Sequence, residues 1–149
     1  MPAQPLSRTL PGTWELLSRV DLTASGERLE EPSLGSDPIA WVIFDRRGHF
    51  AAQFMKRDRS LPSPGSALAP AGPNNTRAQG GYDAYFGTYS VDDRGGTVTT
   101  TLLAALSLEN VGQQYVRGMA VEGDTLTITV ETTSQGRSIT RTLTWKRVG

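Results

Sequence analysis

Hydrophobic and polar residues alternate along most of the chain, in short stretches that are separated by turn residues. Alternation with a period of two is typical of β-strands that place one face on a core, whereas long amphipathic helical patterns are absent. The joints "DRRG", "DDRGG", "VEGD" and "TSQGR" contain the glycines and small polar residues that tight hairpins use. The pattern predicts about eight strands, which begin near Gly12, Ile39, Gly48, Ala84, Thr97, Gly112, Asp124 and Arg137.

Neighbouring strands joined by hairpins predict an all-β fold, an antiparallel up-and-down β-barrel of about eight strands. Closure of the barrel would also remove the free edges that so many strands rich in threonine and valine otherwise expose. A length of 149 residues fits one domain around one core, so we expect residues 1–149 to form a single domain.

The segment from Ser60 to Gly81 interrupts the alternation, because it is rich in proline and glycine and contains few apolar residues. Its length predicts either a lid over the barrel mouth or an excursion without a role. We expect one short helical turn near Asn75 to Gln79. The triplet "NNT" at 74–76 matches a glycosylation acceptor, which we attribute to chance because no secretion signal precedes it.

Composition narrows the classes of partner and cofactor. Fifteen basic and fifteen acidic residues cancel, so we expect neither a nucleic acid nor a membrane as partner. The absence of cysteine excludes disulfides and thiolate chemistry, and with no apolar leader segment it predicts a cytoplasmic protein. One histidine without cysteine argues against a zinc site, and no dinucleotide or phosphate-binding motif is present, so no metal and no cofactor are expected.

Several blocks together resemble the bacterial lipocalin-like domain family, a group of small calycin-type β-barrels. The blocks are "LPGTWELLSR", "GHFAAQFMKRDR", "YDAYFGTYSVDDRGGTVT", "GDTLTIT" and "LTWKRV", and their order and spacing extend over nearly the whole chain. The resemblance implies a barrel with an interior site for a small hydrophobic or aromatic ligand. Gly12 and Trp14 resemble the lipocalin opening motif, which implies that Trp14 lies at the closed end under a basic residue of the last strand, here Arg147.

The stretch "GHFAAQFMKR" has two faces, and its orientation decides what lines the barrel. One face carries His49, Gln53 and Met55, and the other carries Phe50 and Phe54. We expect the first face to point inward, because interiors that hold a ligand include polar groups. Phe50 and Phe54 would then pack on the outer wall.

Similar polar and aromatic sets occupy single faces of other predicted strands. Tyr85 and Tyr89 share one face, Tyr115 and Arg117 share another, and Arg141 lies on a third. The alternative is that these residues face outward, since charged residues on strands usually face water and outward tyrosine is common in sheets.

The leading interpretation is an enzyme without a cofactor that catalyses an isomerisation, cyclisation or lyase step on a small apolar or aromatic molecule. His49 would be the general acid or base, and Tyr85 and Tyr89 would donate hydrogen bonds to the substrate. The expected ligand-binding residues are Gln53, Met55, Tyr115, Arg117 and Arg141. A carrier or sensor of a hydrophobic small molecule is the alternative, a barrel filled by its own side chains is a third, and either a monomer or a homodimer is compatible with the sequence.

Overall fold

The computed structural model describes residues 4–59 and 74–149. All eight predicted strands are present, together with one short additional strand and two short helices. In chain order the elements are α1 (Leu6–Thr9), β1 (Gly12–Thr23), β2 (Arg28–Leu29), β3 (Ile39–Phe44), β4 (His49–Met55), β5 (Tyr82–Asp92), β6 (Thr97–Ala105), the 3-10 helix η1 (Leu108–Asn110), β7 (Gln114–Glu122), β8 (Thr125–Ser134) and β9 (Arg137–Arg147).

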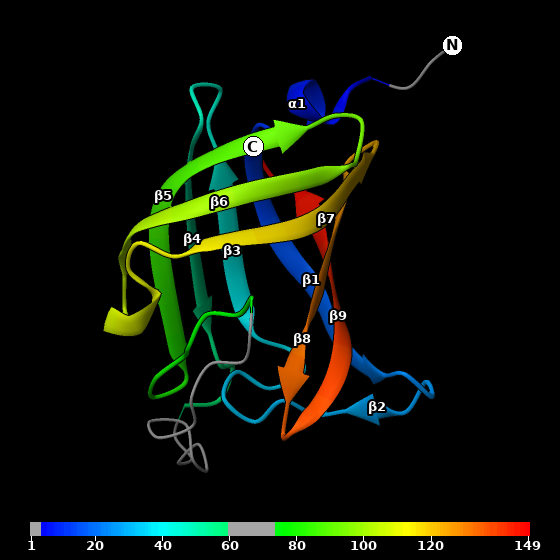
Figure 1. Cartoon of the computed structure of the whole chain (residues 1–149), viewed down its shortest axis with the longest axis vertical. Coiled ribbons are helices and arrows are strands. Elements are labelled where there is room, and N and C mark those ends of the chain that lie inside the picture. Colours follow the sequence, from blue (N-terminus) through cyan, green and yellow to red (C-terminus); the bar gives the residue numbers. More distant parts are fainter. Residues whose placement is uncertain (1–3, 60–73) are drawn as a thin grey trace.

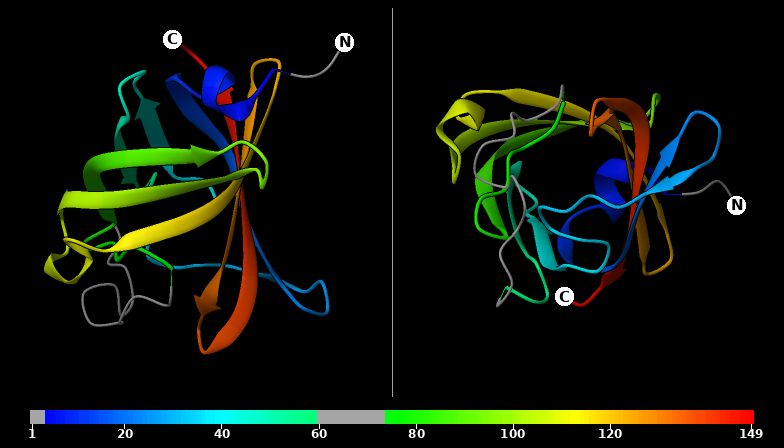
Figure 2. Two further views of the ribbon diagram at one scale, coloured as in Figure 1. Left: turned by 45° about the horizontal axis from the view of Figure 1, so that its top comes forward. Right: turned by 90° about the horizontal axis from the view of Figure 1, so that it is seen from below.

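The strands form one antiparallel sheet that closes on itself, as the sequence predicts. Its order is β2-β1-β3-β4-β5-β6-β7-β8-β9, and β1 also pairs with β9 from Trp14 opposite Arg147 to Thr23 opposite Ile139. This last pairing closes an eight-stranded barrel, while β2 is an extra strand beside β1 (Figure 1). Figure 2 shows the ring of strands from one end and α1 lying across the other end.

Strand β1 contains an irregularity that reverses which of its residues face inward. Its pairing with β9 shifts between Leu16 and Ser18, and both Leu17 and Ser18 are exposed. Such a bulge places two consecutive residues on the outside and changes the phase of the alternation that follows. Arg19 and Asp21 therefore point into the barrel.

The end of the barrel beside α1 is closed by an aromatic ring and a basic side chain, as the lipocalin resemblance implies. The guanidinium carbon of Arg147 lies 4.2 Å from the centre of the Trp14 ring, a cation–π contact that joins the first and last strands of the closure. Arg147 also donates hydrogen bonds to the backbone carbonyls of Pro11 and Thr9, and the Trp14 indole N–H donates to the Leu10 carbonyl. Leu10 and Trp14 are fully buried, so this end is a packed core.

The segment before β5 differs from the sequence prediction. Asn75 to Ala78 form no regular secondary structure, and Gln79 makes an isolated bridge with Tyr82, so the predicted helical turn near Asn75 to Gln79 is wrong. The polar side chains of this segment bond to the barrel instead of capping a helix, as described below. The rest of the predicted loop, residues 60–73, and the prediction that it forms a lid lie outside the described residues.

Candidate ligand-binding site

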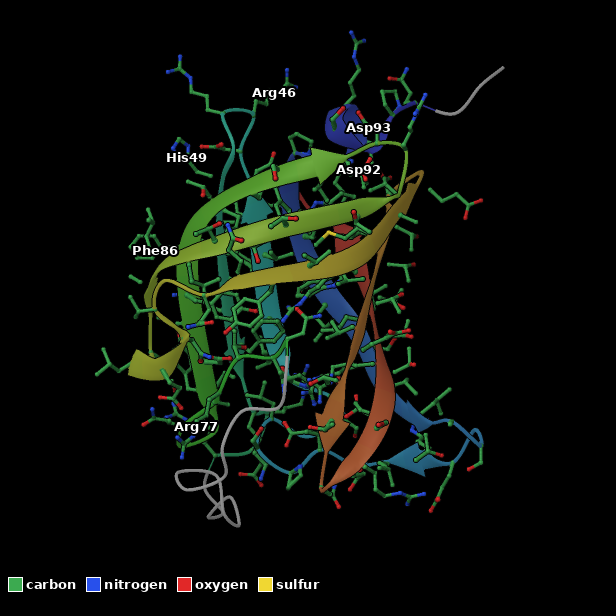
Figure 3. All side chains as sticks on the ribbon, viewed as in Figure 1. Arg46, His49, Arg77, Phe86, Asp92 and Asp93 are labelled. Atoms are coloured by element: carbon green, nitrogen blue, oxygen red, sulfur yellow. The ribbon has the colours of Figure 1, made fainter. Side chains whose placement is uncertain are left out.

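The orientation predicted for β4 is wrong: His49, Gln53 and Met55 lie on the outer face of the barrel. The His49 side chain is 61% exposed, and its Nδ1 lies 2.9 Å from Oδ2 of Asp45 (Figure 3). Phe50 and Phe54 are buried inside, where rings of neighbouring strands meet them. Burial of two phenylalanine rings is worth several kcal/mol more than burial of the polar face, and this outweighs the argument for a polar lining.

Tyr89 is inward-facing as predicted, but it lies away from the polar residues. Its ring packs edge-to-face on Phe44 with centroids 5.0 Å apart, and its hydroxyl donates to the backbone carbonyl of Asp45 at the rim of the barrel. Partial burial raises the pKa of Tyr89, and the nearby Asp45 carboxylate raises it further. Tyr89 therefore belongs to the packed end of the barrel.

The other half of the interior holds charged and polar side chains from four strands. The predicted residues Tyr85, Tyr115, Arg117 and Arg141 all point into it, and three residues that sequence reasoning missed join them. We call this group the polar cluster; its members are Arg19 and Asp21 of β1, Asp83 and Tyr85 of β5, Tyr115 and Arg117 of β7, and Arg141 of β9.

A buried ion pair lies at the centre of the polar cluster. The Nε and Nη2 atoms of Arg141 donate to the two carboxylate oxygens of Asp21 over 2.8 and 2.9 Å, and the two side chains are 5% and 2% exposed. Arg19 lies beside this pair, where it bonds to Glu31 and to the Gly35 carbonyl. Burial, together with the charge of Arg141, lowers the pKa of Arg19. Removing charges from water is costly, so a barrel that needed only to be packed would not require these residues.

Asp83 is a second buried carboxyl group, and no arginine lies within ion-pairing distance of it among the described residues. It accepts hydrogen bonds from the Thr76 hydroxyl over 2.7 Å and from the Ala84 backbone N–H over 3.0 Å. Burial raises the pKa of Asp83, and the Thr76 bond opposes this only in part. Burial also raises the pKa of its neighbour Tyr85. Asp83 therefore holds a proton more tightly than an aspartate in water does.

Arg117 lies over the ring of Tyr115, with its guanidinium carbon 5.4 Å from the ring centre. Its Nη2 donates to the backbone carbonyl of Asn74 over 3.1 Å. Its Nε is buried and has no hydrogen-bond partner among the described residues. The positive charge of Arg117 acts on Asp83, Tyr85 and Tyr115, whose pKa values it lowers against the effect of burial.

Residues 74–76 each contact the polar cluster, and we call these three consecutive residues, Asn74–Thr76, the polar strap. Besides the Asn74 contact, the Asn75 side-chain oxygen accepts a bond from Arg141, and Thr76 donates to Asp83. Each strap residue thus meets a different charged residue of the cluster, and each offers it an uncharged group.

The strap is anchored at both of its ends. The Asn74 side chain exchanges two hydrogen bonds with the backbone N–H and carbonyl of Val116 in β7, over 3.1 and 2.9 Å. Asn74 has a φ of 58°, a left-handed conformation that asparagine tolerates better than most residues. After the strap, the Arg77 backbone N–H donates to Asn110, whose side-chain amide donates to the Tyr115 hydroxyl.

The cluster supplies hydrogen-bond donors, the positive charge of Arg117, which contacts no carboxylate in the described part of the chain, and the protonatable carboxyl group of Asp83. Within the residues that the structure describes, no three histidine, cysteine, aspartate or glutamate side chains come together in a way that could hold a metal ion. In the same residues, no helix is long and apolar enough to span a membrane. The arrangement is chemically suited to holding a polar group of a small organic molecule, or to exchanging a proton with it.

Comparison with known proteins places the fold in a family. None of the curated proteins matches the chain. The family model described as the lipocalin-like domain matches residues 11–148, which is nearly the whole chain. The closed antiparallel barrel, with Trp14 under Arg147 at one end, agrees with that match. The chain therefore belongs to the lipocalin-like domain family.

Proposed function

We propose that the protein binds a small organic molecule inside its barrel, against the polar cluster. A lipocalin-like barrel is a fold suited to binding small molecules in its interior. The observation that carries the proposal is the cluster itself: charged residues from four strands converge inside a barrel whose other half is packed with apolar side chains. Natural cores exclude such charges unless they serve a purpose, because their desolvation costs several kcal/mol for each ion.

Three tryptophans provide a test of where a small molecule binds. Trp14 lies at the closed end, Trp41 is exposed on the outer wall, and Trp145 is buried inside with an indole N–H that has no hydrogen-bond partner among the described residues. Each indole N–H gives one NMR signal in a ¹⁵N-labelled protein, and single tryptophan-to-phenylalanine variants assign them.

The experiment is a titration of labelled protein with N-phenyl-1-naphthylamine, an apolar uncharged fluorophore. Binding against the cluster should move the Trp145 indole signal and leave the Trp41 signal in place. Movement of the Trp41 signal alone would mean that the molecule binds the outer wall, where Trp41 and Phe86 form exposed apolar surface. A titration that moves no indole signal would also contradict the proposal.

A second candidate function is that of an enzyme without a cofactor, acting on the bound molecule by isomerisation, cyclisation or elimination. Asp83 favours this candidate, because it is a buried carboxyl beside Tyr85 and Arg117 whose pKa is raised by burial, and such a group can accept and return a proton. The neighbouring Tyr85 would donate a hydrogen bond to a substrate carbonyl. This assignment replaces His49, which lies on the outer wall, with Asp83.

Proton transfer can be tested without knowing the substrate. A panel of small ketones with exchangeable α-hydrogens is incubated with the protein in D₂O, and deuterium uptake is measured by mass spectrometry. Asp83→Asn should lower any catalysed uptake on the order of a hundredfold, whereas His49→Gln should leave it unchanged. Uptake that survives in Asp83→Asn but is lost in His49→Gln would contradict the assignment, and a panel without catalysed uptake would favour the carrier.

A further inference from the structure

The three arginines of the polar cluster differ in what neutralises them. Arg141 has Asp21, and Arg19 has Glu31. Among the described residues, no carboxylate lies within ion-pairing distance of Arg117. Its bonded partners are uncharged, the carbonyl of Asn74 and the side chain of Tyr85, and Asp83, whose pKa it lowers, has its Oδ2 occupied by Thr76. A cation inside a barrel is normally paired, so Arg117 is placed to receive an anion.

The two atoms of Arg117 that matter lie on one edge of its guanidinium group. On Arg141 the same edge, Nε and Nη2, binds both oxygens of the Asp21 carboxylate. On Arg117, Nη2 holds the single carbonyl oxygen of Asn74, and Nε is buried without a partner among the described residues. This planar edge matches the spacing of two carboxylate oxygens. One half of this carboxylate-binding edge is thus taken by a backbone carbonyl, and the other half has no bonded partner among the described residues.

The surroundings of Arg117 favour a ligand whose remaining part is apolar. The Tyr115 ring lies against the guanidinium group of Arg117. Tyr85, which is a neighbour of Arg117, stacks on Phe54 with centroids 6.4 Å apart, and Phe54 meets Trp145 edge-to-face at 5.8 Å. These aromatic side chains lead from the cluster toward the packed half of the barrel.

We propose that the ligand is an apolar molecule that ends in a carboxylate, and that this carboxylate binds side-on to Nε and Nη2 of Arg117 in place of the Asn74 carbonyl. The proposal rests on the proposed function and adds the chemical class of its ligand. Replacement is favourable because a carboxylate accepts from both Nε and Nη2 and neutralises the guanidinium charge, whereas the carbonyl accepts one bond and carries no charge. Without ligand, the Asn74 carbonyl of the polar strap accepts the Arg117 bond. When the ligand binds, this one bond breaks and the carboxylate takes its place.

The test is displacement of bound N-phenyl-1-naphthylamine by decanoate, decanol and methyl decanoate, which share one chain and differ in charge. Decanoate should displace the fluorophore at a concentration at least tenfold lower than the two uncharged compounds do. Arg117→Gln should abolish this difference. Arg117→Lys, which keeps the charge and loses the planar edge, should retain only part of it. Arg57→Gln, which removes an exposed arginine paired with Asp37, is the matched control and should behave as the unaltered protein.

A second variant tests the contact with the strap and does not alter the arginine. Asn74→Gly keeps a residue that adopts positive φ but removes the two side-chain bonds to Val116 that hold the carbonyl on Arg117. Decanoate should then displace the fluorophore at a several-fold lower concentration, because the competing carbonyl is released, while decanol should be unaffected. Near-ultraviolet circular dichroism shows whether Arg117→Gln folds. If it does not, Asn74→Gly and Arg117→Lys test whether Arg117 binds the carboxylate.

The possible results separate the two proposals. Equal displacement by decanoate and decanol in the unaltered protein would overturn the carboxylate assignment and leave the proposed function standing. An unchanged preference for decanoate in Arg117→Lys, with no effect of Asn74→Gly, would also overturn it. If the fluorophore does not move the Trp145 indole signal, the proposed function fails and the carboxylate assignment fails with it.

Discussion

The two halves of the barrel interior are built on the same strands with opposite chemistry. Beside α1, Trp14, Leu10 and Phe44 are buried, and the charge of Arg147 lies at the rim over an aromatic ring. Seven residues further along β1, Asp21 and Arg141 form an ion pair that is as deeply buried as the aromatic core. The first half is held by apolar contacts and the second by directed bonds.

This difference indicates which half of the interior can serve ligand binding. Apolar packing stabilises the fold wherever side chains of the right volume meet. Buried charges add little net stability when they are paired and subtract much when a partner is lost. We therefore attribute the stability of the barrel mainly to its apolar half, and ligand binding to the polar cluster.

The largest expected effect comes from breaking the buried pair. Asp21→Ala should lower the free energy of unfolding by about 3–5 kcal/mol, because Arg141 is left buried and, among the described residues, keeps only its side-chain bond to Asn75. Replacing both residues with apolar side chains, as Asp21→Leu with Arg141→Met, should recover most of this loss. Urea denaturation measures both variants. A single variant that costs as little as the double one would show that the pair is not desolvated.

A smaller effect is expected at the closed end. Arg147→Met keeps an apolar stem over Trp14 but loses the cation–π contact and the bonds to Pro11 and Thr9, which should cost about 1–3 kcal/mol. Lys146→Met, at an exposed position of the same strand, is the control for the change of charge. Decanoate should still displace the fluorophore as in the unaltered protein. A parallel loss of binding would mean that the two halves are coupled.

The smallest effect concerns the pH dependence of stability. Burial raises the pKa of Asp83 above its value in the unfolded chain, so the folded state binds this proton more tightly. Its contribution to stability is therefore greatest in acid and is lost as the pH rises through the raised pKa. Relative to Asp83→Asn, the unaltered protein should lose thermal stability as the pH rises above the ordinary aspartate pKa of about 4, as followed by circular dichroism.

A matched carboxyl at the other end should show the opposite sign. Ser7 donates both its hydroxyl and its backbone N–H to Asp93, and these bonds lower the pKa of Asp93. Relative to Asp93→Asn, the unaltered protein should gain stability as the pH rises. If both differences have the same sign, the Asp83 carboxyl is not in the environment described here.

The barrel itself was predictable, because each strand carries its own alternation and each joint its own turn residues. The β4 face was not, because orientation depends on the partners of a strand as well as on its own pattern. Tyr85 was correctly predicted to face inward, and Ala52 is its cross-strand partner, so Ala52 and the other residues of its face must point inward too. That face includes Phe50 and Phe54, which leaves His49 outside.

Part of the polar cluster was also within reach of sequence reasoning. Alternation alone places Asp83 on the same face as Tyr85. Arg19 and Asp21 were out of reach, because counting by twos from Trp14 puts Val20 and Leu22 inside and both charged residues outside. The contacts of the polar strap join residues far apart in the chain, as Asn74 and Val116 are, and no local pattern indicates them.

The bulge at Leu17 and Ser18 has a consequence for how barrels of this kind can diverge. Deleting one of these two residues would restore simple alternation and still leave Arg19 and Asp21 facing inward, because their pairing with β9 would not change. Straightening the bulge without a deletion would slip the rest of β1 by one residue and turn Val20 and Leu22 inward, so that Arg141 would lose its partner. The bulge can thus absorb a change of chain length by one residue, whereas its loss at constant length would convert the chemistry of half an interior.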